Sequence, residues 1–359
     1  MIPMPICLYC TKSADTDEHP LPASLGEFKD APMITLCKSC NNKLGILDEQ
    51  LSRSGPEAFM RRFYGVQGRS THTAINPHYR GSAGGGPIKM TSFDESLGID
   101  VPMEIVRGNE ARQMRQLIFR EVSGKIIYLP LPDTLRAPVQ LKAAFDNLCL
   151  SEIADAQVIY DPEDSDWVEP LVSAVWPQVV FENRTLTPQK HHCTAKVEFQ
   201  VTDRYFRSIA KIGFHYFLSQ FPQYGGGESK FELIRKFICD DGPIYRANEF
   251  IGERQHPLLG NLHDGGRPDG WQAHCLAAEI KGGICRAHVQ LFICEHFPSI
   301  PYSITLAKAE STAVTEDVGF GHAYLYFENG LMGKFAGETL RCDYASILGP
   351  QPPLKAVIG

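Results

Sequence analysis

The sequence has 359 residues, a formal net charge of −7, and 43% hydrophobic and 21% charged residues. This length suits two or three domains, and the negative charge argues against a protein that coats nucleic acid through bulk charge. No apolar run approaches the roughly 18 residues of a membrane span, and the first residues do not resemble a secretory signal. With 11 cysteines, the chain is expected to be cytoplasmic, with reduced thiols and no role at a membrane.

Two C-x-x-C pairs lie within the first 40 residues: Cys7 with Cys10, and Cys37 with Cys40. Each pair presents two thiolates from one tight turn, and two such pairs complete a tetrahedral zinc site. A site closed by four thiolates has no open position for a substrate. We therefore expect a structural zinc ion that stabilises a region too small to fold on its core alone. The alternative is four unrelated buried cysteines.

The residues between and after the cysteine pairs predict two short strands followed by a helix. The stretch TDEHPLP (16–22) combines two acids with a histidine, and its prolines prevent a helix from following. Residues 32–37 can form a second strand, and residues 41–53 can form a helix with a leucine face. This order can bring three polar side chains into one pocket: Glu18, His19 and Asn41.

The stretches CLYC, DEHPLPASLGEF and LCKSCNNKLG resemble the zinc-ribbon type of HNH nuclease over roughly residues 5–65. The resemblance implies an N-terminal ββα-metal fold held together by the four-cysteine zinc site. It also implies that His19 is the general base, and that Glu18 and Asn41 are the ligands of a divalent ion. The long C-terminal extension resembles that of bacterial HNH proteins, and no dependable activity follows from it.

The sequence departs from the family pattern at two positions. The family's middle Asn, which orients the histidine, falls near Pro32, and only Gly26 stands where a glycine pair is usual. Asp17 is an alternative to Glu18 as the metal ligand. Asp48, further along the predicted helix, is expected on a solvated face. Lys43 is equally consistent with a phosphate contact and with an ordinary exposed lysine.

These residue types suit phosphodiester hydrolysis. A divalent ion held by few protein ligands leaves room for the phosphate oxygens and the leaving oxygen. A neutral histidine whose pKa lies near the working pH can take a proton from the attacking water. Because Asn41 would supply a neutral oxygen ligand, the site is expected to favour Mg²⁺ or Mn²⁺ over zinc.

Residues 66–90 are predicted to be a linker or flexible arm, since residues 66–89 contain five glycines and no hydrophobic periodicity. Residues 61–142 contain 12 Lys and Arg against 7 Asp and Glu, in a chain that is acidic overall. Arg69 and Arg80 could therefore track a phosphate backbone. The alternative for each is an ordinary solvated linker residue.

Residues 91–359 predict a larger mixed α+β region, with a helix packed on an antiparallel sheet toward the C-terminus. A hairpin is indicated at Asn329–Gly330. HHC (191–193) and CEH (294–296) are read as packing or surface residues. The other predicted elements are a strand at 124–131, a helix at 140–153, an exposed acidic loop at 160–170, a strand at 195–201 and a helix at 203–221.

The helix at 203–221 carries Arg207, Lys211 and His215 at i, i+4 and i+8, on one face. A second phosphate contact is one interpretation. The favoured interpretation is the solvated side of a helix, because charge stripes usually face water.

The sequence therefore predicts an α+β metal-dependent HNH endonuclease that hydrolyses DNA, most simply duplex DNA. One alternative is a nuclease subunit of a restriction or antiviral defence assembly, activated by a partner or ligand. Such a partner, or a second copy of the chain, would bind through the C-terminal region. The other alternative is a catalytically decayed zinc-ribbon protein that binds nucleic acid.

Overall fold

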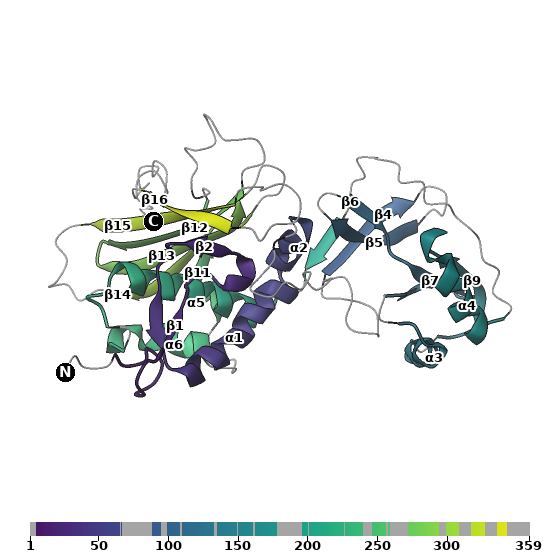
Figure 1. Ribbon diagram of the computed structural model, residues 1–359, viewed down its shortest axis with the longest axis horizontal. Helices are drawn as coiled ribbons and strands as arrows, with labels where there is room; N and C mark the ends of the chain where they lie inside the picture. The colour runs from purple at the N-terminus through teal and green to yellow at the C-terminus, as the bar shows by residue number, and fades with distance from the viewer. Residues whose placement is uncertain are drawn as a thin grey trace, which may run out of the picture. The chain divides into compact units, whose positions relative to one another are not determined.

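Figure 1 shows the computed structural model of the chain. The described residues are 5–64, 66, 88–94, 99–107, 110–132, 135–148, 150–160, 162–177, 196–199, 201–225, 227–239, 246–255, 258, 272–293, 299–308, 317–326 and 336–342.

The chain divides into two compact units that interleave along the sequence. Unit 1 comprises Met1–Ser52, Val66–Thr73 and Val201–Gly359, and unit 2 comprises Arg53–Gly65 and Ala74–Gln200. The domains predicted from the sequence are instead three consecutive stretches of the chain, residues 1–65, 66–90 and 91–359. The N-terminal residues thus share a unit with the C-terminal residues, and the elements that surround the predicted site come from both ends of the sequence.

In the N-terminal part of unit 1, the two predicted strands and the helix after them are present. Strand β1 (Thr16–Glu18) pairs antiparallel with β3 (Ile34–Leu36), and α1 (Lys38–Arg53) follows directly. The carboxylate of Asp15 accepts a hydrogen bond of 3.0 Å from the backbone N–H of Lys38, one of the N–H groups that a helix start leaves without an intrahelical partner. The predicted leucine face of the helix is confirmed as buried: Leu44, Leu47 and Leu51.

A seven-stranded sheet forms the largest layer of unit 1. All neighbouring strands pair antiparallel except β16 and β2, which pair parallel. The N-terminal segment therefore supplies the edge strand β2, and a short helix η1 (Ala23–Leu25) precedes it. In spatial order the strands are β11 (Ile251–Glu253), β14 (Tyr302–Lys308), β13 (Ile284–Ile293), β12 (Gln272–Lys281), β15 (Val318–Tyr326), β16 (Ala336–Cys342) and β2 (Glu27–Lys29).

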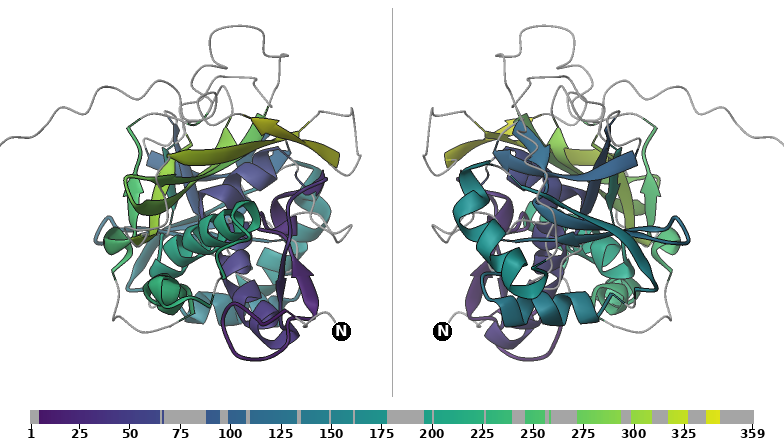
Figure 2. Two further views of the ribbon diagram at one scale, coloured as in Figure 1. Left: turned by 90° about the vertical axis from the view of Figure 1, so that its left-hand side faces the viewer. Right: turned by 90° about the vertical axis from the view of Figure 1, so that its right-hand side faces the viewer.

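Helix α5 (Asp203–Gln220) matches the predicted helix and packs on this sheet. Figures 1 and 2 show it beneath the strands. Gly213 allows the close approach, because a Cβ atom there would lie 2.9 Å from Ile304 Cδ1 and 3.1 Å from the Cβ atom of Ala287. The opposite face of α5 contacts the N-terminal segment, for example where the Ser208 hydroxyl donates to the Leu47 carbonyl at 2.6 Å. Helix α5 is thus the middle of three layers.

The remaining helices of unit 1 are short. Helix α6 (Glu232–Cys239) packs against α5, and it follows η3 (Ser229–Phe231) directly. A further turn, η4 (Ala247–Glu249), leads into β11. Strands β15 and β16 pair as the predicted hairpin requires. The predicted turn at Asn329–Gly330 lies outside the described residues.

Within its described residues, unit 2 contains two smaller antiparallel sheets and three α-helices. One sheet has the order β10 (Lys196–Phe199), β4 (Ile88–Asp94), β5 (Ile99–Arg107) and β6 (Glu110–Gln113). The other has the order β8 (Ile126–Pro130), β7 (Gln116–Glu121) and β9 (Ile153–Ile159). The helices are α2 (Pro56–Phe63), α3 (Pro138–Asp146) and α4 (Ser165–Val175), with η2 (Pro162–Asp164) before α4.

Two predictions for unit 2 are corrected. The stretch at 160–170 is not an exposed loop, because it contains η2 and most of α4. Val168, Leu171 and Val172 recur at helical spacing and are buried in the core, which stabilises the helix despite the five acidic residues of the stretch 160–170. The helix predicted at 140–153 ends at Asp146, and the strand β9 begins at its predicted last residue.

The structure confirms the mixed α+β class. Among the described residues, no helix combines the length and the apolar character that crossing a bilayer requires. The segments HHC (191–193) and CEH (294–296) lie outside the described part of the chain.

Candidate functional site

The two C-x-x-C pairs come together at the start of unit 1. The sulfur atoms of Cys7, Cys10, Cys37 and Cys40 all lie within 4.8 Å of one another. Cys10 Sγ and Cys37 Sγ lie 3.6 Å apart. Thiolates around a tetrahedral zinc ion, with bonds of about 2.3 Å, are about 3.8 Å apart. The cluster therefore could bind a structural metal ion such as zinc.

The thiols of this cluster differ in their acidity. The backbone N–H of Cys40 points at Cys37 Sγ at 3.4 Å, and it lowers the pKa of Cys37 to about 7. Burial raises the pKa of Cys40. Because a metal binds the thiolate form, Cys37 is the cysteine best prepared to lose its proton first.

The predicted acid and histidine lie at the end of β1. Thr16 and Glu18 share one face of this strand, and Asp17 points to the other, where it is exposed. Glu18 is half-buried with a side-chain exposure of 16%, and His19 is half-buried directly after the strand. The strand geometry therefore favours Glu18 over Asp17 as the acid of an enclosed site.

Asn41 lies close to the same face of β1. It stands in the first turn of α1, and its side-chain Nδ2 donates to Thr16 Oγ1 at 3.4 Å. Since Thr16 and Glu18 are two residues apart on one strand face, Asn41 contacts the face of β1 that also carries Glu18. The structure thus places Asn41 against the strand that carries Glu18.

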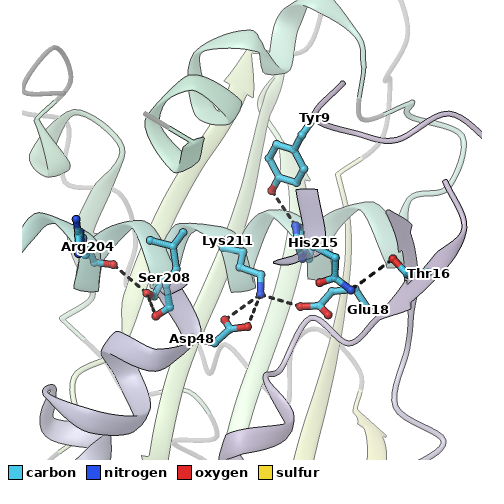
Figure 3. A network of polar contacts seen from close by, with 10 residues as sticks. Tyr9, Thr16, Glu18, Asp48, Arg204, Ser208, Lys211 and His215 are labelled. Carbon is cyan, nitrogen blue, oxygen red and sulfur yellow. Dashed lines mark hydrogen bonds and ion pairs between the residues drawn. The ribbon is translucent and has the colours of Figure 1, made fainter. Parts of the chain in front are cut away.

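A buried lysine from α5 occupies this place as well. Lys211 Nζ donates to Glu18 Oε1 at 2.7 Å and to both carboxylate oxygens of Asp48 at 2.8 Å. The side chain of Lys211 has 0% exposure. Figure 3 shows the ammonium group between the two acids. The prediction that Lys211 faces water is therefore wrong, because α5 is covered on both sides.

Asp48 also departs from its prediction. Its side chain is only 21% exposed and is not on a solvated face. Burial raises the pKa of Asp48, although the nearby charge of Lys211 opposes that effect. Burial alone would lower the pKa of Lys211, but the charges of Asp48 and Glu18 outweigh it and raise that pKa. The lysine is therefore held in its charged form.

The other two polar residues of the stripe are buried too. Arg207 donates to the Ile238 carbonyl from Nε at 3.1 Å and from a terminal nitrogen at 2.7 Å. His215 Nε2 lies 2.7 Å from the hydroxyl of Tyr9, which stands between Cys7 and Cys10 (Figure 3). Burial, followed by the charge of Lys211, places the pKa of His215 well below its usual range. The stripe joins α5 to the cysteine cluster and to α6, and it does not form a second phosphate contact.

A signal for this burial was present in the sequence. Apolar residues cover most of the circumference of the stretch 203–221. A helix with so wide an apolar surface is expected to be largely buried. A lysine inside such a helix requires acidic partners, since an unpaired buried charge is very costly. The partners themselves could not be identified, because Glu18 and Asp48 lie 193 and 163 residues away in the chain.

Glu18 and Asn41 each offer an oxygen atom that could serve as a ligand of a divalent ion. Within the described residues, Glu18 Oε2 accepts no hydrogen bond, and the amide oxygen of Asn41 is equally unengaged. Two carboxylates and one lysine carry a net charge of −1 when all are ionised, so a further cation would be attracted. Neutral and anionic oxygen donors of this kind suit Mg²⁺ and Mn²⁺.

Three further predicted residues are the basic side chains proposed to contact phosphate. Lys43 is exposed on α1, where it is free to contact a phosphate or water. Arg69 and Arg80 lie outside the described residues. The described residues include no side chain that hydrogen-bonds the ring of His19, and Pro32 stands where the family pattern has its orienting Asn.

The chain was compared with protein-family models, with curated proteins and with solved structures, and none of them matches it.

Proposed function

We propose that the protein is a metal-dependent endonuclease of the HNH type that hydrolyses phosphodiester bonds in DNA. The observation that carries this proposal is the position of Asn41. Its side chain contacts the strand face that also presents Glu18, and His19 follows Glu18 directly. An acid, an amide and a histidine are thereby grouped on a strand–strand–helix unit whose start is anchored by four clustered cysteines.

In this proposal Glu18, Asn41 and His19 have separate roles in the reaction. Glu18 and Asn41 hold a Mg²⁺ or Mn²⁺ ion, and His19 takes the proton from the attacking water. The ion, when bound, neutralises charge on the phosphate and on the leaving oxygen. The half-buried position of His19 leaves its ring accessible to a water molecule. The cysteine cluster binds zinc and holds β1 against α1. The basic residues Lys43, Arg69 and Arg80 are proposed phosphate contacts.

One observation favours a second candidate, in which the module binds nucleic acid without cleaving it. Glu18 already has a cationic partner in Lys211, and no described side chain orients His19. In a decayed site the lysine would replace the divalent ion permanently. The two candidates differ in one measurable property, which is cleavage that depends on both a divalent ion and His19.

The test is nicking of supercoiled plasmid by the zinc-loaded protein, with Mg²⁺ or Mn²⁺ and with EDTA. We expect metal-dependent nicking that falls by about 10²–10⁴-fold in His19→Ala, the usual contribution of general-base catalysis. Glu18→Gln should also lose activity. Asp17→Asn is the matched control, since Asp17 is the exposed acid on the opposite strand face, and it should retain activity. No nicking by the zinc-replete wild type would favour the second candidate.

A further inference from the structure

The ammonium group of Lys211 directs all its hydrogen-bond donors to two carboxylates. An ammonium group has three protons, and the structure shows three short contacts, one to Glu18 and two to Asp48. The side chain is completely buried, and it comes from a helix that is fixed between the sheet and the N-terminal segment. Lys211 therefore has no spare donor for a substrate, and any role in the reaction must act through its neighbours.

The neighbour through which Lys211 can affect the reaction is Glu18, the proposed metal ligand. A divalent ion bound at Glu18 Oε2 would share a single carboxylate with the ammonium group at Oε1. Like charges at such short range repel each other, and partial burial weakens screening by water. Asp48 counteracts this repulsion from the far side of the lysine, since it adds one negative charge to the cluster. The two residues thus have opposite effects on a cation at Glu18.

We propose that Lys211 and Asp48 set the divalent-ion affinity of Glu18, with Lys211 weakening metal binding and Asp48 strengthening it. This inference rests on the proposed function, because it requires a metal site at Glu18. The lysine neutralises the buried acids while the ion is absent, and its charge keeps the ion from binding too tightly. Lys211 and Asp48 are therefore residues that tune the site and do not touch the reacting atoms.

The proposal predicts effects of opposite sign, which a purely structural role does not. If Lys211 and Asp48 only held α5 in place, replacing either one would loosen Glu18 and weaken metal binding. If they tune the charge at Glu18, Lys211→Met strengthens binding and Asp48→Asn weakens it. Both substitutions nearly conserve side-chain volume, so the charge is the main quantity that changes.

The experiment is a titration of the full-length, zinc-loaded protein with Mn²⁺, followed by the electron paramagnetic resonance signal of the free ion. We expect Lys211→Met to lower the Kd for Mn²⁺ at least tenfold, and Asp48→Asn to raise it by about tenfold. In a Glu18→Gln background neither substitution should change the remaining Mn²⁺ binding, because the tuned ligand is gone. Lys142→Met, which removes an exposed lysine from α3, is the control for net charge and should leave the Kd unchanged.

The outcomes separate the two proposals. Equal affinity in wild type, Lys211→Met and Asp48→Asn, or weaker binding in both, would overturn the tuning role while leaving the metal site intact. The absence of any Glu18-dependent Mn²⁺ binding in the wild type would overturn the proposed function, and the tuning role with it. Zinc content and circular dichroism establish that each variant is folded. If Lys211→Met does not fold, an unchanged Kd in Asp48→Asn alone overturns the tuning role.

Discussion

Helices α3 and α5 each carry a lysine that forms ion pairs, and the two lysines lie in very different surroundings. On α3, Lys142 pairs with Asp146 one turn later, and both side chains are more than half exposed. On α5, Lys211 is completely buried between two acids from β1 and α1. An exposed pair at this spacing contributes about 0.3–0.5 kcal/mol to stability. Leaving buried acids without their cation costs about 3–5 kcal/mol.

The difference shows which charged residues connect the parts of the chain. Lys142 and Asp146 belong to one helix and could be lost without affecting any other element. Lys211 links the strand that carries Glu18 to the helix that carries Asp48, and both to the C-terminal sheet through α5. Because three elements depend on this single ammonium group, the comparison predicts unequal effects of equivalent substitutions.

The largest effect is expected for Lys211→Met. The methionine side chain retains most of the volume, so the loss comes from the two half-buried acids that remain without a cation. We expect the free energy of unfolding to fall by about 3–5 kcal/mol, and by no more than about 0.5 kcal/mol for the control Lys142→Met. Urea denaturation of both variants measures this. Equal losses would contradict the contrast between α3 and α5.

A smaller effect is expected for Asp48→Asn. The amide oxygen still accepts a hydrogen bond from Lys211, and Glu18 still balances the lysine charge. We therefore expect a loss of about 1–2 kcal/mol in the free energy of unfolding, which is clearly less than for Lys211→Met. The same denaturation series tests this order. A larger loss for Asp48→Asn would mean that Asp48, and not Lys211, is the centre of the cluster.

The smallest effect concerns pH and His274, a buried histidine of β12. His274 Nε2 lies 3.2 Å from the Leu25 carbonyl, and Nδ1 accepts from the Phe292 N–H at 2.9 Å. Burial lowers the pKa of His274 to about 3. Below about pH 6.5 the unfolded chain therefore binds a proton at His274 that the folded chain does not bind. As a result, the free energy of unfolding falls as the pH drops toward the pKa of the folded state.

This linkage should contribute about 1 kcal/mol between about pH 6.5 and pH 5.5. His274→Gln offers one donor and one acceptor and does not titrate. Thermal unfolding at both pH values should show a smaller acid-induced loss for this variant than for the wild type. The cysteine cluster is identical in both proteins, so metal loss cancels in the comparison. An equal loss in both would show that His274 takes up a proton in the folded state.

The local elements of unit 1 could be predicted because their signals are short-range. The two cysteine pairs, strands β1 and β3 between them, the leucine face of α1 and the extent of α5 all follow from residue patterns within short stretches of the sequence. The contacts of Lys211 could not be predicted, because Glu18 lies 193 residues away. In unit 2, the acids and prolines of 160–170 suggested a loop, but burial of Val168, Leu171 and Val172 stabilises α4.

The central claim is that Glu18 and Asn41 hold a divalent ion beside His19. Anomalous diffraction from crystals grown with Mn²⁺ tests it most directly, because the signal locates the ion independently of any activity. The account predicts an anomalous manganese peak next to the side chains of Glu18 and Asn41, absent from Glu18→Gln crystals that retain the metal of the cysteine cluster. No peak at Glu18 in the wild type, or a peak that persists in Glu18→Gln, would contradict it.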